Sequence, residues 1–442
     1  MQTFSLFLLL QSCHPIQVAV DMDSGTDSPI VVVDSEEVET ADTTVPVETG
    51  PWDTSILDTD SSEVVEETGG TEEIPGADDP IEALFSLAGV HEVEITVSED
   101  EWDILNAGNW DTVEGDVVFD DVPLPSTGVR IKGRLGSYRD LSGKSGFKLD
   151  FNEYVPEQRL WGLKKLNLNN MVQDSAMTHE ITAYAAFRAA GAPAPRVGYA
   201  WVRVNELDFG LYSVVEVYDD EFLEANYANP DGNLYDGDYY LWPDWSYTLI
   251  DFQRDSDDYF VLDEGEDVGL ADIIAITDAV AATGGKSSFY EALGALIDWG
   301  AFFGMWAGEI WTGHYDSYSY NKNNYRVYFD PTDGLADFFP WDPDWAFYSS
   351  TPITSPSGLL AYYCMRDTAC KADFMAFLPL AMERIDALDL VSTVDEAADL
   401  IAPYVREDPR KEYSGRSVES SQEALRNWIE TRTDTVNRSF GL

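Results

Sequence analysis

The chain has 442 residues, enough for one large domain or two with tails, and 44% of them are hydrophobic, which permits a sizeable core. Its 82 acidic residues far outnumber its 26 basic residues, and the formal net charge is −56. A surface this acidic repels nucleic acid and anionic membrane surfaces, so neither is expected as an electrostatic partner.

The N-terminus predicts an exported, lipid-anchored protein. Residues 4–10 form an apolar run that is too short to span a membrane and is typical of a signal peptide. The following Leu10-Gln11-Ser12-Cys13 resembles a bacterial lipobox, so residues 1–13 are expected to act as a signal peptide whose Cys13 is lipidated at the cell envelope. The alternative is an ordinary buried strand that ends in a cysteine.

Residues 14–80 contain no Lys or Arg and are rich in Asp, Glu, Thr, Ser, Pro and Gly. Such a segment cannot bury enough apolar surface to offset the entropy lost on ordering, and its like charges extend it. It is predicted to be a flexible acidic tether. A metal-binding role is the alternative, although no spacing in it resembles a calcium loop.

The folded part is expected at 81–442, with mainly strands in its first half. Ser98 and Glu101 form a capping-box pattern that opens a short helix after a first strand. Asn205-Glu206 marks a hairpin turn, and Gly191 ends a helix that Asp174 or Ser175 opens. The predicted elements are a strand and helix in 91–105, two strands in 115–137, strands at 145–154 and 160–170, a helix at 174–191, a hairpin at 197–218 and a helix at 219–227.

The second half is predicted to be more helical. A long, largely apolar helix is expected at 288–313, followed by a hairpin and an acidic loop in 319–347 and by helices at 372–388, 394–405 and 417–438. Strands followed by helices indicate an α+β arrangement with two lobes.

Basic residues are concentrated in one segment of this acidic chain. The first is Arg130, and residues 130–165 hold nine Lys and Arg against four acids. Either an anionic ligand docks there, or these residues form ion pairs with the surrounding acids. They are Arg130, Lys132, Arg134, Arg139, Lys144, Lys148, Arg159, Lys164 and Lys165.

The same segment contains a possible phosphate-binding arrangement. Gly133 and Gly136 flank Arg134-Leu135 in a predicted loop, where backbone amides can approach phosphate oxygens. Lys148 lies on the next strand and Glu180 on the following helix, as in kinases that orient a strand Lys with a helix Glu. The alternative for two glycines near a turn is a turn without function.

A second arrangement favours phosphoryl transfer. Asp316 follows a helix, and Asn321 comes five residues later, the separation used by kinase catalytic loops. Asp342 and Asp344 lie in Pro340-Trp341-Asp342-Pro343-Asp344, where carboxylates plus substrate phosphates can hold magnesium. The alternatives are a turn cap for the Asp–Asn pair and an Asx-type turn for the second motif.

Several long blocks of the sequence resemble the CotH family of secreted, kinase-like proteins. The blocks are 132–196, 201–223, 232–238, 316–347 and 424–440, which cover roughly 85–440 in the family's order. The resemblance implies an atypical, reduced protein-kinase-like fold of two lobes, β-rich at the N-terminal side and helical at the C-terminal side, that uses ATP and Mg²⁺ (or Mn²⁺ or Ca²⁺).

Carried over residue by residue, the resemblance implies a catalytic Asp316 and a metal-binding Asp342. The loop spacing and the acidic motif add Asn321 and Asp344 as further candidate metal ligands. It implies a nucleotide-binding Lys148, with Lys144 and Lys132 as rivals, supported by Glu180 and Arg134. The loop Gly-Arg-Leu-Gly-Ser (133–137) departs from the family's more usual Gly-Asn/Ser-Ser pattern, which puts the details of phosphate binding in doubt.

Cys364 and Cys370 have a spacing that can close a small disulfide loop, which an exported protein permits. Two buried free thiols are the alternative. Without convergent His residues, a zinc site is not expected.

Three functions compete. The first is an atypical protein kinase that phosphorylates Ser or Thr of surface or coat proteins. The second is a structural or adhesive cell-surface or spore-coat protein on the same fold, since fold does not fix function, and scarce extracellular ATP favours it. The third is a metal-dependent hydrolase, because clustered carboxylates also suit two-metal sites. The presence of Asp316, Asn321, Asp342 and Asp344 favours the kinase.

Overall fold

The structure is a computed structural model that describes residues 79–242, 244, 246–349 and 354–442. The expected signal peptide, Cys13 and nearly all of the expected tether therefore lie outside the described residues. The first described helix is α1 (Pro80–Leu84), which Asp79 caps by accepting the backbone N–H of Ile81.

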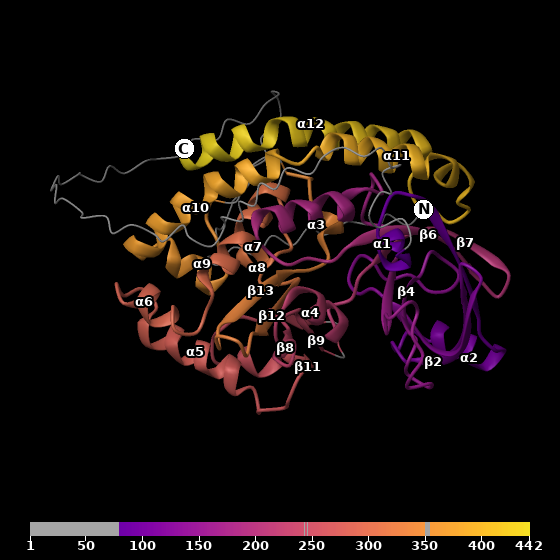
Figure 1. Ribbon diagram of the computed structural model, residues 1–442, viewed down its shortest axis with the longest axis horizontal. Coiled ribbons are helices and arrows are strands. Elements are labelled where there is room, and N and C mark those ends of the chain that lie inside the picture. The colour runs from indigo at the N-terminus through magenta and orange to yellow at the C-terminus, as the bar shows by residue number, and fades with distance from the viewer. Residues whose placement is uncertain (1–78, 243, 245, 350–353) are drawn as a thin grey trace, which may run out of the picture. The chain divides into compact units, whose positions relative to one another are not determined.

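Seven strands of the N-terminal part close into a β-barrel, drawn in indigo to magenta in Figure 1. Neighbours are antiparallel, except for the parallel pair β1–β6 that closes the ring in the order β1–β2–β3–β4–β5–β7–β6. The strands are β1 (Val90–Thr96), β2 (Val113–Phe119), β3 (Val122–Lys132), β4 (Gly146–Asp150), β5 (Lys165–Asn169), β6 (Val197–Val204) and β7 (Leu207–Val215).

Alternation along the strands gives the barrel a hydrophobic core of its own. In β2 every second residue is buried, and Val113, Val117 and Phe119 join that core. The predicted capping box is confirmed, because Ser98 and Glu101 cap α2 (Glu99–Asn106) reciprocally. The predicted turn at Asn205-Glu206 is also confirmed: both residues have positive φ between β6 and β7.

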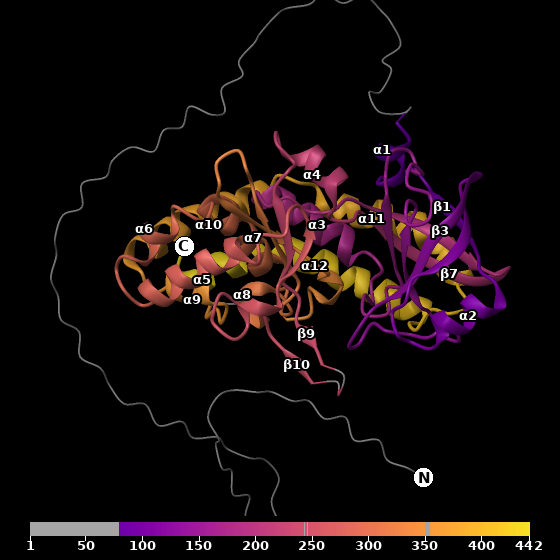
Figure 2. The ribbon, with the colours of Figure 1, turned by 90° about the horizontal axis from the view of Figure 1, so that it is seen from below.

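The C-terminal part combines helices with a four-stranded sheet in the order β11–β8–β12–β13. Its strands are β8 (Asn233–Asp236), β11 (Val261–Glu264), β12 (Tyr325–Phe329) and β13 (Ala336–Pro340). A short hairpin of β9 (Tyr240–Leu241) and β10 (Tyr247–Thr248) extends from this part, as Figure 2 shows. No elements were predicted for 228–287, the range that contains β8, β11 and helix α5.

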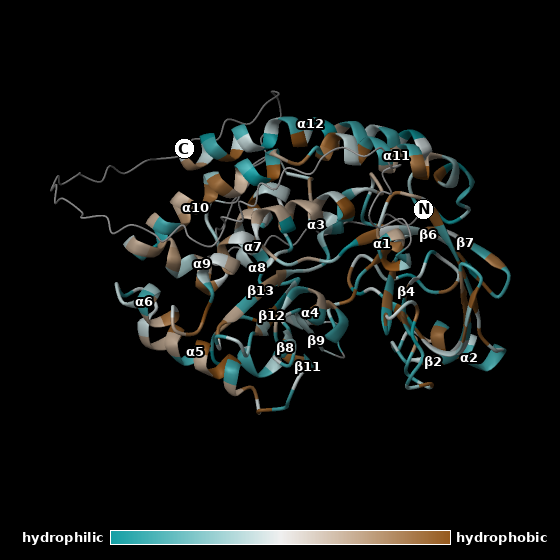
Figure 3. Cartoon of the chain, viewed as in Figure 1, coloured by the Kyte–Doolittle hydropathy of each residue, from teal (hydrophilic) through white to brown (hydrophobic). Residues whose placement is uncertain are grey.

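The helices are α3 (His179–Ala190), α4 (Asp220–Asn226), α5 (Ala271–Thr283), α6 (Phe289–Leu293), α7 (Trp299–Thr312), α8 (Tyr318–Asn321), α9 (Leu359–Cys364), α10 (Thr368–Asp386), α11 (Leu390–Glu407) and α12 (Gly415–Phe440), with 3₁₀ turns η1 (Asp257–Tyr259) and η2 (Pro343–Trp345). In Figure 3, α12 is largely hydrophilic, as expected for a helix with few buried positions. No helix in the described part of the chain is both long enough and apolar enough to span a membrane.

Two helix predictions need correction. The long helix expected at 288–313 is divided into α6 and α7, because Asp298 accepts the backbone N–H groups of Gly300 and Ala301 and caps a new helix there. The helix expected from 174 begins only at His179, because the Asp174 carboxylate holds the preceding turn. Its predicted end is confirmed: Gly191 has a left-handed φ of 104°.

The larger core of the C-terminal part is aromatic and brings α3 against α7. Trp306 of α7 stacks on Phe374 of α10 with ring centroids 3.8 Å apart. A Cβ at Gly308 would lie 2.3 Å from the Phe187 ring, so only glycine permits this approach of α3 to α7. This packing also places α3, the helix that carries Glu180.

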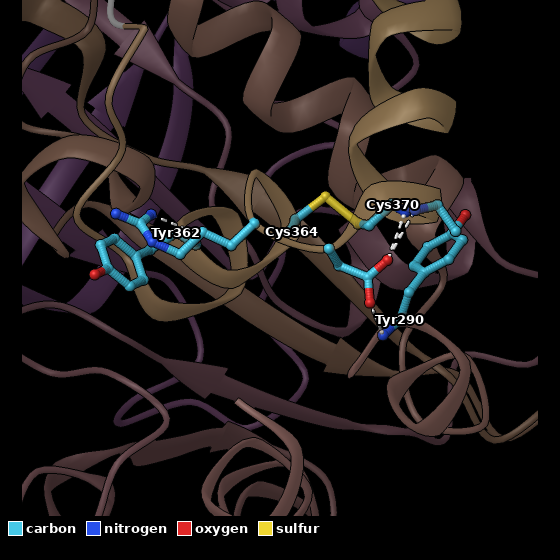
Figure 4. Close-up of a disulfide and its surroundings, with 7 residues drawn as sticks. Tyr290, Tyr362, Cys364 and Cys370 are labelled. Atoms are coloured by element: carbon cyan, nitrogen blue, oxygen red, sulfur yellow. Dashed lines mark hydrogen bonds between the residues drawn. A yellow bond between two sulfur atoms is a disulfide. The ribbon is translucent and has the colours of Figure 1, made fainter. Parts of the chain in front are cut away.

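Cys364, at the end of α9, and Cys370, in the first turn of α10, are joined by a disulfide (Figure 4). Both are fully buried. Asp367 lies between them and caps α10 by accepting the N–H groups of Ala369 and Cys370 at 2.9 and 3.1 Å.

Candidate active site

A cavity of about 700 Å³ lies where the barrel strands β3–β5 face β8, β11 and the segments that follow α7 and β13. Its lining is divided by charge, with a basic wall on the barrel strands and an acidic wall on the C-terminal part. The basic wall consists of Arg130, Lys132, Lys148 and Lys165, and the acidic wall of Asp236, Asp238, Asp263, Glu264, Asp316, Asp342 and Asp344. Arg134 of the β3–β4 loop and Arg326 of β12 also line the cavity. Size and polarity suit a phosphate-bearing small molecule.

The strand register builds the basic wall. Arg130 and Lys132 lie two positions apart on β3 and so share a face, and Arg130 is paired with Lys148 of β4. Burial and the neighbouring charges of Arg130 and Lys165 lower the pKa of Lys148 to about 8. Lys165 has an acidic partner, Glu264, at 3.5 Å. Three close cations in one wall favour an anionic ligand.

Lys132 is connected to the helix glutamate through a side-chain network. Its ammonium group donates to the Asn169 Oδ1 atom, and Asn169 Nδ2 donates to Glu180 Oε1 at 2.5 Å. Ser213 donates to the other oxygen of Glu180. Burial is the main reason that the pKa of Glu180 rises to about 7, and nearby Asp342 raises it further.

The three candidate nucleotide lysines therefore lie in different surroundings. Lys132 lines the cavity and reaches Glu180 through Asn169. Lys148 lines the cavity, but its ammonium group makes no hydrogen bond or ion pair to another described residue. Lys144 is not part of the cavity lining, since it is buried in an ion pair with Asp408.

The loop between β3 and β4 borders the cavity with Gly133, Arg134, Leu135 and Ser137. Gly133 has a φ of 106°, a left-handed conformation that favours glycine. Arg134 donates to the Tyr239 carbonyl at 3.0 Å and lies over the Tyr239 ring at 5.4 Å. The loop is thereby joined to the C-terminal part across the cavity.

Asp316 lies in the turn between α7 and α8 and is held by three amides. Asn321 Nδ2 donates to its Oδ1 at 2.5 Å, and Asn323 and Asn324 each donate to its Oδ2 at 3.1 Å. Burial, aided by Asp342 and Asp238, raises the pKa of Asp316 to about 6. The carboxyl group is thus fixed in orientation and still mainly ionised at pH 7.

Asp342 and Asp344 lie at the end of β13, on either side of Pro343. Asp342 has a left-handed φ of 44°, and its N–H donates to the Tyr184 hydroxyl at 3.2 Å. Burial raises the pKa of both carboxyl groups, and the charge of Asp342 raises that of Asp344 further. Lys132 opposes these shifts.

The acidic wall has the composition of a divalent-cation site. Asp316, Asp342 and Asp344 have raised pKa values because they are buried close to like charges. With Asn321 they offer the hard oxygen ligands that Mg²⁺ prefers, and Mg²⁺ needs only one or two protein carboxylates when phosphates and water complete its shell. These residues therefore fit such an ion.

The tightest cluster of acidic ligands in the described ranges lies elsewhere, at Asp219, Asp220 and Glu221. Lys164 forms ion pairs with Asp220 and Glu221, and Asp219 caps α4. These acids thus have local roles.

Sequence patterns did not identify several residues of the site. Arg326 of β12 forms ion pairs with Asp236 and Asp238, at 2.9 and 3.2 Å, and balances part of the acidic wall. Its guanidinium lies 5.2 Å from the Trp341 ring, and the Lys132 ammonium lies 5.5 Å from the same ring. Asn169 and Asn323 were also missed; the repeated asparagines of Asn321–Asn324 were the only signal for the latter.

Comparison with known proteins identifies a relative and a distant structural match. A 243-residue stretch is 25% identical to inner spore coat protein H of Bacillus subtilis (strain 168), covering 51% of this chain and 63% of the relative. The chain thus spans less than two thirds of that curated relative.

A chain from the Shewanella oneidensis MR-1 toxin–antitoxin complex of HipA, HipB and operator DNA matches 78% of this chain and 82% of its own length. The identity is 14% and the TM-score 0.29, a similarity too low to support any conclusion about this protein.

The family match is broader. Residues 129–436, well over half of the chain, match the family described as CotH kinase protein. The match includes β4, β5, α3 and both acidic segments that border the cavity. The chain belongs to the CotH kinase protein family.

Proposed function

We propose that this protein is a metal-dependent protein kinase with a reduced, two-lobe kinase-like fold, which transfers the γ-phosphoryl group of ATP to Ser or Thr hydroxyls. The observation that carries the proposal is the placement of two arrangements on one cavity. The Lys132–Asn169–Glu180 network enters it from the barrel side, and Asp316, Asn321 and Asp342 border it from the other side.

Each side of the cavity has a separate task in this proposal. Lys132, with Arg130 and Lys148 nearby, binds the phosphate chain electrostatically, and Glu180 and Asn169 orient Lys132. Asp342, with Asn321 and Asp344, would hold Mg²⁺, which supplies neutralisation of phosphate charge when bound. Positioning and charge neutralisation provide most of the catalysis of phosphoryl transfer.

Asp316 is the residue proposed to act on the acceptor. Its three amide partners fix the carboxylate, and a pKa of about 6 leaves it ionised and able to accept a proton at pH 7. The acceptor oxygen bonds to the γ-phosphorus, the bond from that phosphorus to the β–γ bridging oxygen breaks, ADP leaves, and the hydroxyl proton passes to Asp316.

We also propose that the protein works outside the cytoplasm, on surface or coat proteins that contain Ser and Thr. The relative is an inner spore coat protein, and the Cys364–Cys370 disulfide suits an oxidising compartment.

The proposal includes lipidation at Cys13, which would anchor the protein at the cell envelope. Mass spectrometry of the mature N-terminus from native membranes tests it: a lipid-modified Cys13 is expected, and an intact Met1 or unmodified Cys13 contradicts it.

The test of the activity is incubation of the purified mature chain with γ-labelled ATP, Mg²⁺ or Mn²⁺ and a panel of Ser/Thr-containing proteins. Label should enter an acceptor with the wild type and with Asp399→Asn, a matched change on the exposed face of α11. Asp342→Asn should abolish most of it. If no acceptor is labelled and ATP does not bind, while circular dichroism shows an intact fold, the protein is a non-catalytic surface protein.

A further inference from the structure

The connection between α11 and α12 lies against the barrel, far in sequence from the β3–β4 loop. Figures 1 and 2 show both helices reaching from the helical part to the barrel side of the molecule, and α11 contacts β7. Three residues of the connection contact the loop between β3 and β4 or its flank, and Gly133 and Ser137 of that loop line the cavity proposed to hold the nucleotide phosphates. They are Asp408, Arg410 and Glu412.

The innermost contact is a buried ion pair. The Lys144 ammonium donates to Asp408 Oδ2, and both side chains are almost fully excluded from solvent. Asp408 also accepts the backbone N–H groups of Leu211 at 3.0 Å and Arg410 at 2.8 Å. A Cβ at Gly210 would lie 2.2 Å from Asp408 Oδ1, so glycine is required there for the carboxylate to fit.

Two arginines extend this contact along the loop. Arg410 stacks 3.5 Å from the centre of the Phe209 ring and donates to the Leu141 carbonyl at 2.8 Å and to the Gly143 carbonyl. Arg139 of the loop forms a two-pronged ion pair with Glu412, with Nη2 2.8 Å from Oε2. Residues 139–144, the part of the loop outside the cavity lining, are therefore held by several contacts with the α11–α12 connection.

The two halves of the loop are tied to each other. Asn170 Nδ2 donates to the Ser137 carbonyl at 2.9 Å and to the Lys144 carbonyl at 2.7 Å. Arg139 also donates to the Gly136 carbonyl at 2.9 Å. Because Ser137 lines the cavity, a displacement of 139–144 would move the backbone that faces the phosphates.

We infer that the α11–α12 connection is a positioning element, in which Glu412, Asp408 and Arg410 hold the β3–β4 loop in its nucleotide-binding position. The inference rests on the proposed nucleotide site. None of the three residues lines the cavity, so they act through the loop and do not touch the nucleotide. The C-terminal helices thereby set the affinity of a site on the barrel.

The Arg139–Glu412 pair is the place to test this, because each side chain is about one third exposed. Exposed ion pairs contribute little to stability, so its loss should move the loop without unfolding the domain. Removal of Lys144 or Asp408 would leave the other charge buried without its partner and destabilise the fold. Arg426→Glu is the matched control: Arg426 pairs with Asp395 between the same two helices, and neither residue contacts the loop.

The experiment compares wild type with Arg139→Glu, Glu412→Arg, the double swap and Arg426→Glu. Each single loop variant should raise the Kd and KM for ATP with Mg²⁺ about three- to tenfold with little change in kcat. The swap should restore the part of both that the ion pair contributes, because Arg139→Glu also removes the donation to the Gly136 carbonyl. The Tm should match that of Arg426→Glu. Amide hydrogen exchange should speed up at 133–143 in the single variants only.

Faster exchange at 139–143 with no change at 133–137, or an unchanged Kd in both single variants, overturns the inference while leaving the kinase proposal intact. If wild type binds no ATP, the kinase proposal fails, and exchange at 133–137 alone decides whether the connection holds the loop.

Discussion

The two walls of the cavity are built in opposite ways. The basic wall comes from β3, β4 and β5, where barrel register holds Arg130, Lys132 and Lys148 on one face. The acidic wall comes mainly from turns that follow α7 and β13, where Asp316 and Asp342 are fixed by side-chain and backbone hydrogen bonds. In each wall like charges are buried close together, and ion pairs such as those of Arg326 with Asp236 and Asp238 and of Lys165 with Glu264 offset only part of their repulsion.

The difference between the walls indicates the charge of the ligand that would stabilise each one. Burial with like charges lowers the pKa of Lys148 to about 8 and raises that of Asp316 to about 6. An anion would relieve the first wall and a cation the second. A nucleotide bound with a divalent metal would supply both charges in one ligand, as the proposed function requires.

The largest effect is expected from the acidic wall. Asp316→Asn should lower kcat for phosphoryl transfer about 10²-fold or more, because the proton acceptor is lost, and should leave nucleotide affinity nearly unchanged. Steady-state kinetics and direct binding measure the two quantities, with Asp399→Asn as control. A variant that melts early instead would show that Asp316 mainly caps the turn.

Substitutions in the basic wall should have the next largest effect, a loss of ATP affinity that differs between Lys132 and Lys148. Lys132→Met should weaken ATP binding about tenfold or more, because Lys132 alone is oriented by the Asn169–Glu180 network. Lys148→Met should weaken it less, and Lys371→Met, on the exposed surface of α10, should not change it. A larger loss for Lys148→Met would assign the nucleotide lysine to β4.

The contribution of Glu309, a buried acid outside both walls, to folding stability should depend on pH but not on Mg²⁺. Burial raises the pKa of Glu309 to about 7 from its ordinary 4.5. The folded protein therefore holds this proton more tightly than the unfolded chain, and the favourable contribution is lost as pH rises through about 7. Burial lowers the pKa of His314 to about 3, so this residue destabilises the fold as pH falls below 6.5. Because wild type combines both effects, the Glu309 contribution is measured by comparison with a Glu309 variant.

The Tm of wild type should fall more than that of Glu309→Gln, by at least a few degrees, between pH 5.5 and 8. Mg²⁺ should leave that difference unchanged, since Glu309 is not part of the cavity lining. Equal pH dependence in both proteins would contradict the raised pKa of Glu309.

The disulfide should have the smallest effect on the cavity. Its closed loop is short, and loop-closure entropy gives a stabilisation of about 2 kcal/mol. The double variant Cys364→Ala and Cys370→Ala should lower the Tm by several degrees and leave ATP affinity unchanged, because neither residue lines the cavity. Altered ATP affinity would show that α9 and α10 transmit strain to the site.

Sequence patterns located the elements that obey local rules. The turn at Asn205-Glu206 and the Ser98 capping box have strong local signals. Asp316, Asn321, Asp342 and Asp344 were selected by loop spacing, and all four border the cavity. The break between α6 and α7 was missed because the segment is largely apolar, although Asp298 provided a capping signal.

Tertiary pairings could not be predicted from the sequence. Which lysine reaches Glu180 depends on the register of β3 through β5 and on Asn169 as an intermediate, and no local pattern contains either. The contact of Lys144 with Asp408 joins residues separated by 264 positions. The β3–β4 loop has several lysines nearby, so the sequence favoured Lys148 and left Lys144 and Lys132 as close rivals.

The most direct test of the central claim measures how Mg²⁺ and ATP binding depend on each other. Titration calorimetry of ATP with and without Mg²⁺ should show at least about tenfold tighter binding with the metal in wild type and Asp316→Asn. Asp342→Asn should lose most of that gain, because it removes one of few ligand charges. Equal ATP affinity with and without Mg²⁺ in a folded wild-type protein would contradict the account of the two walls.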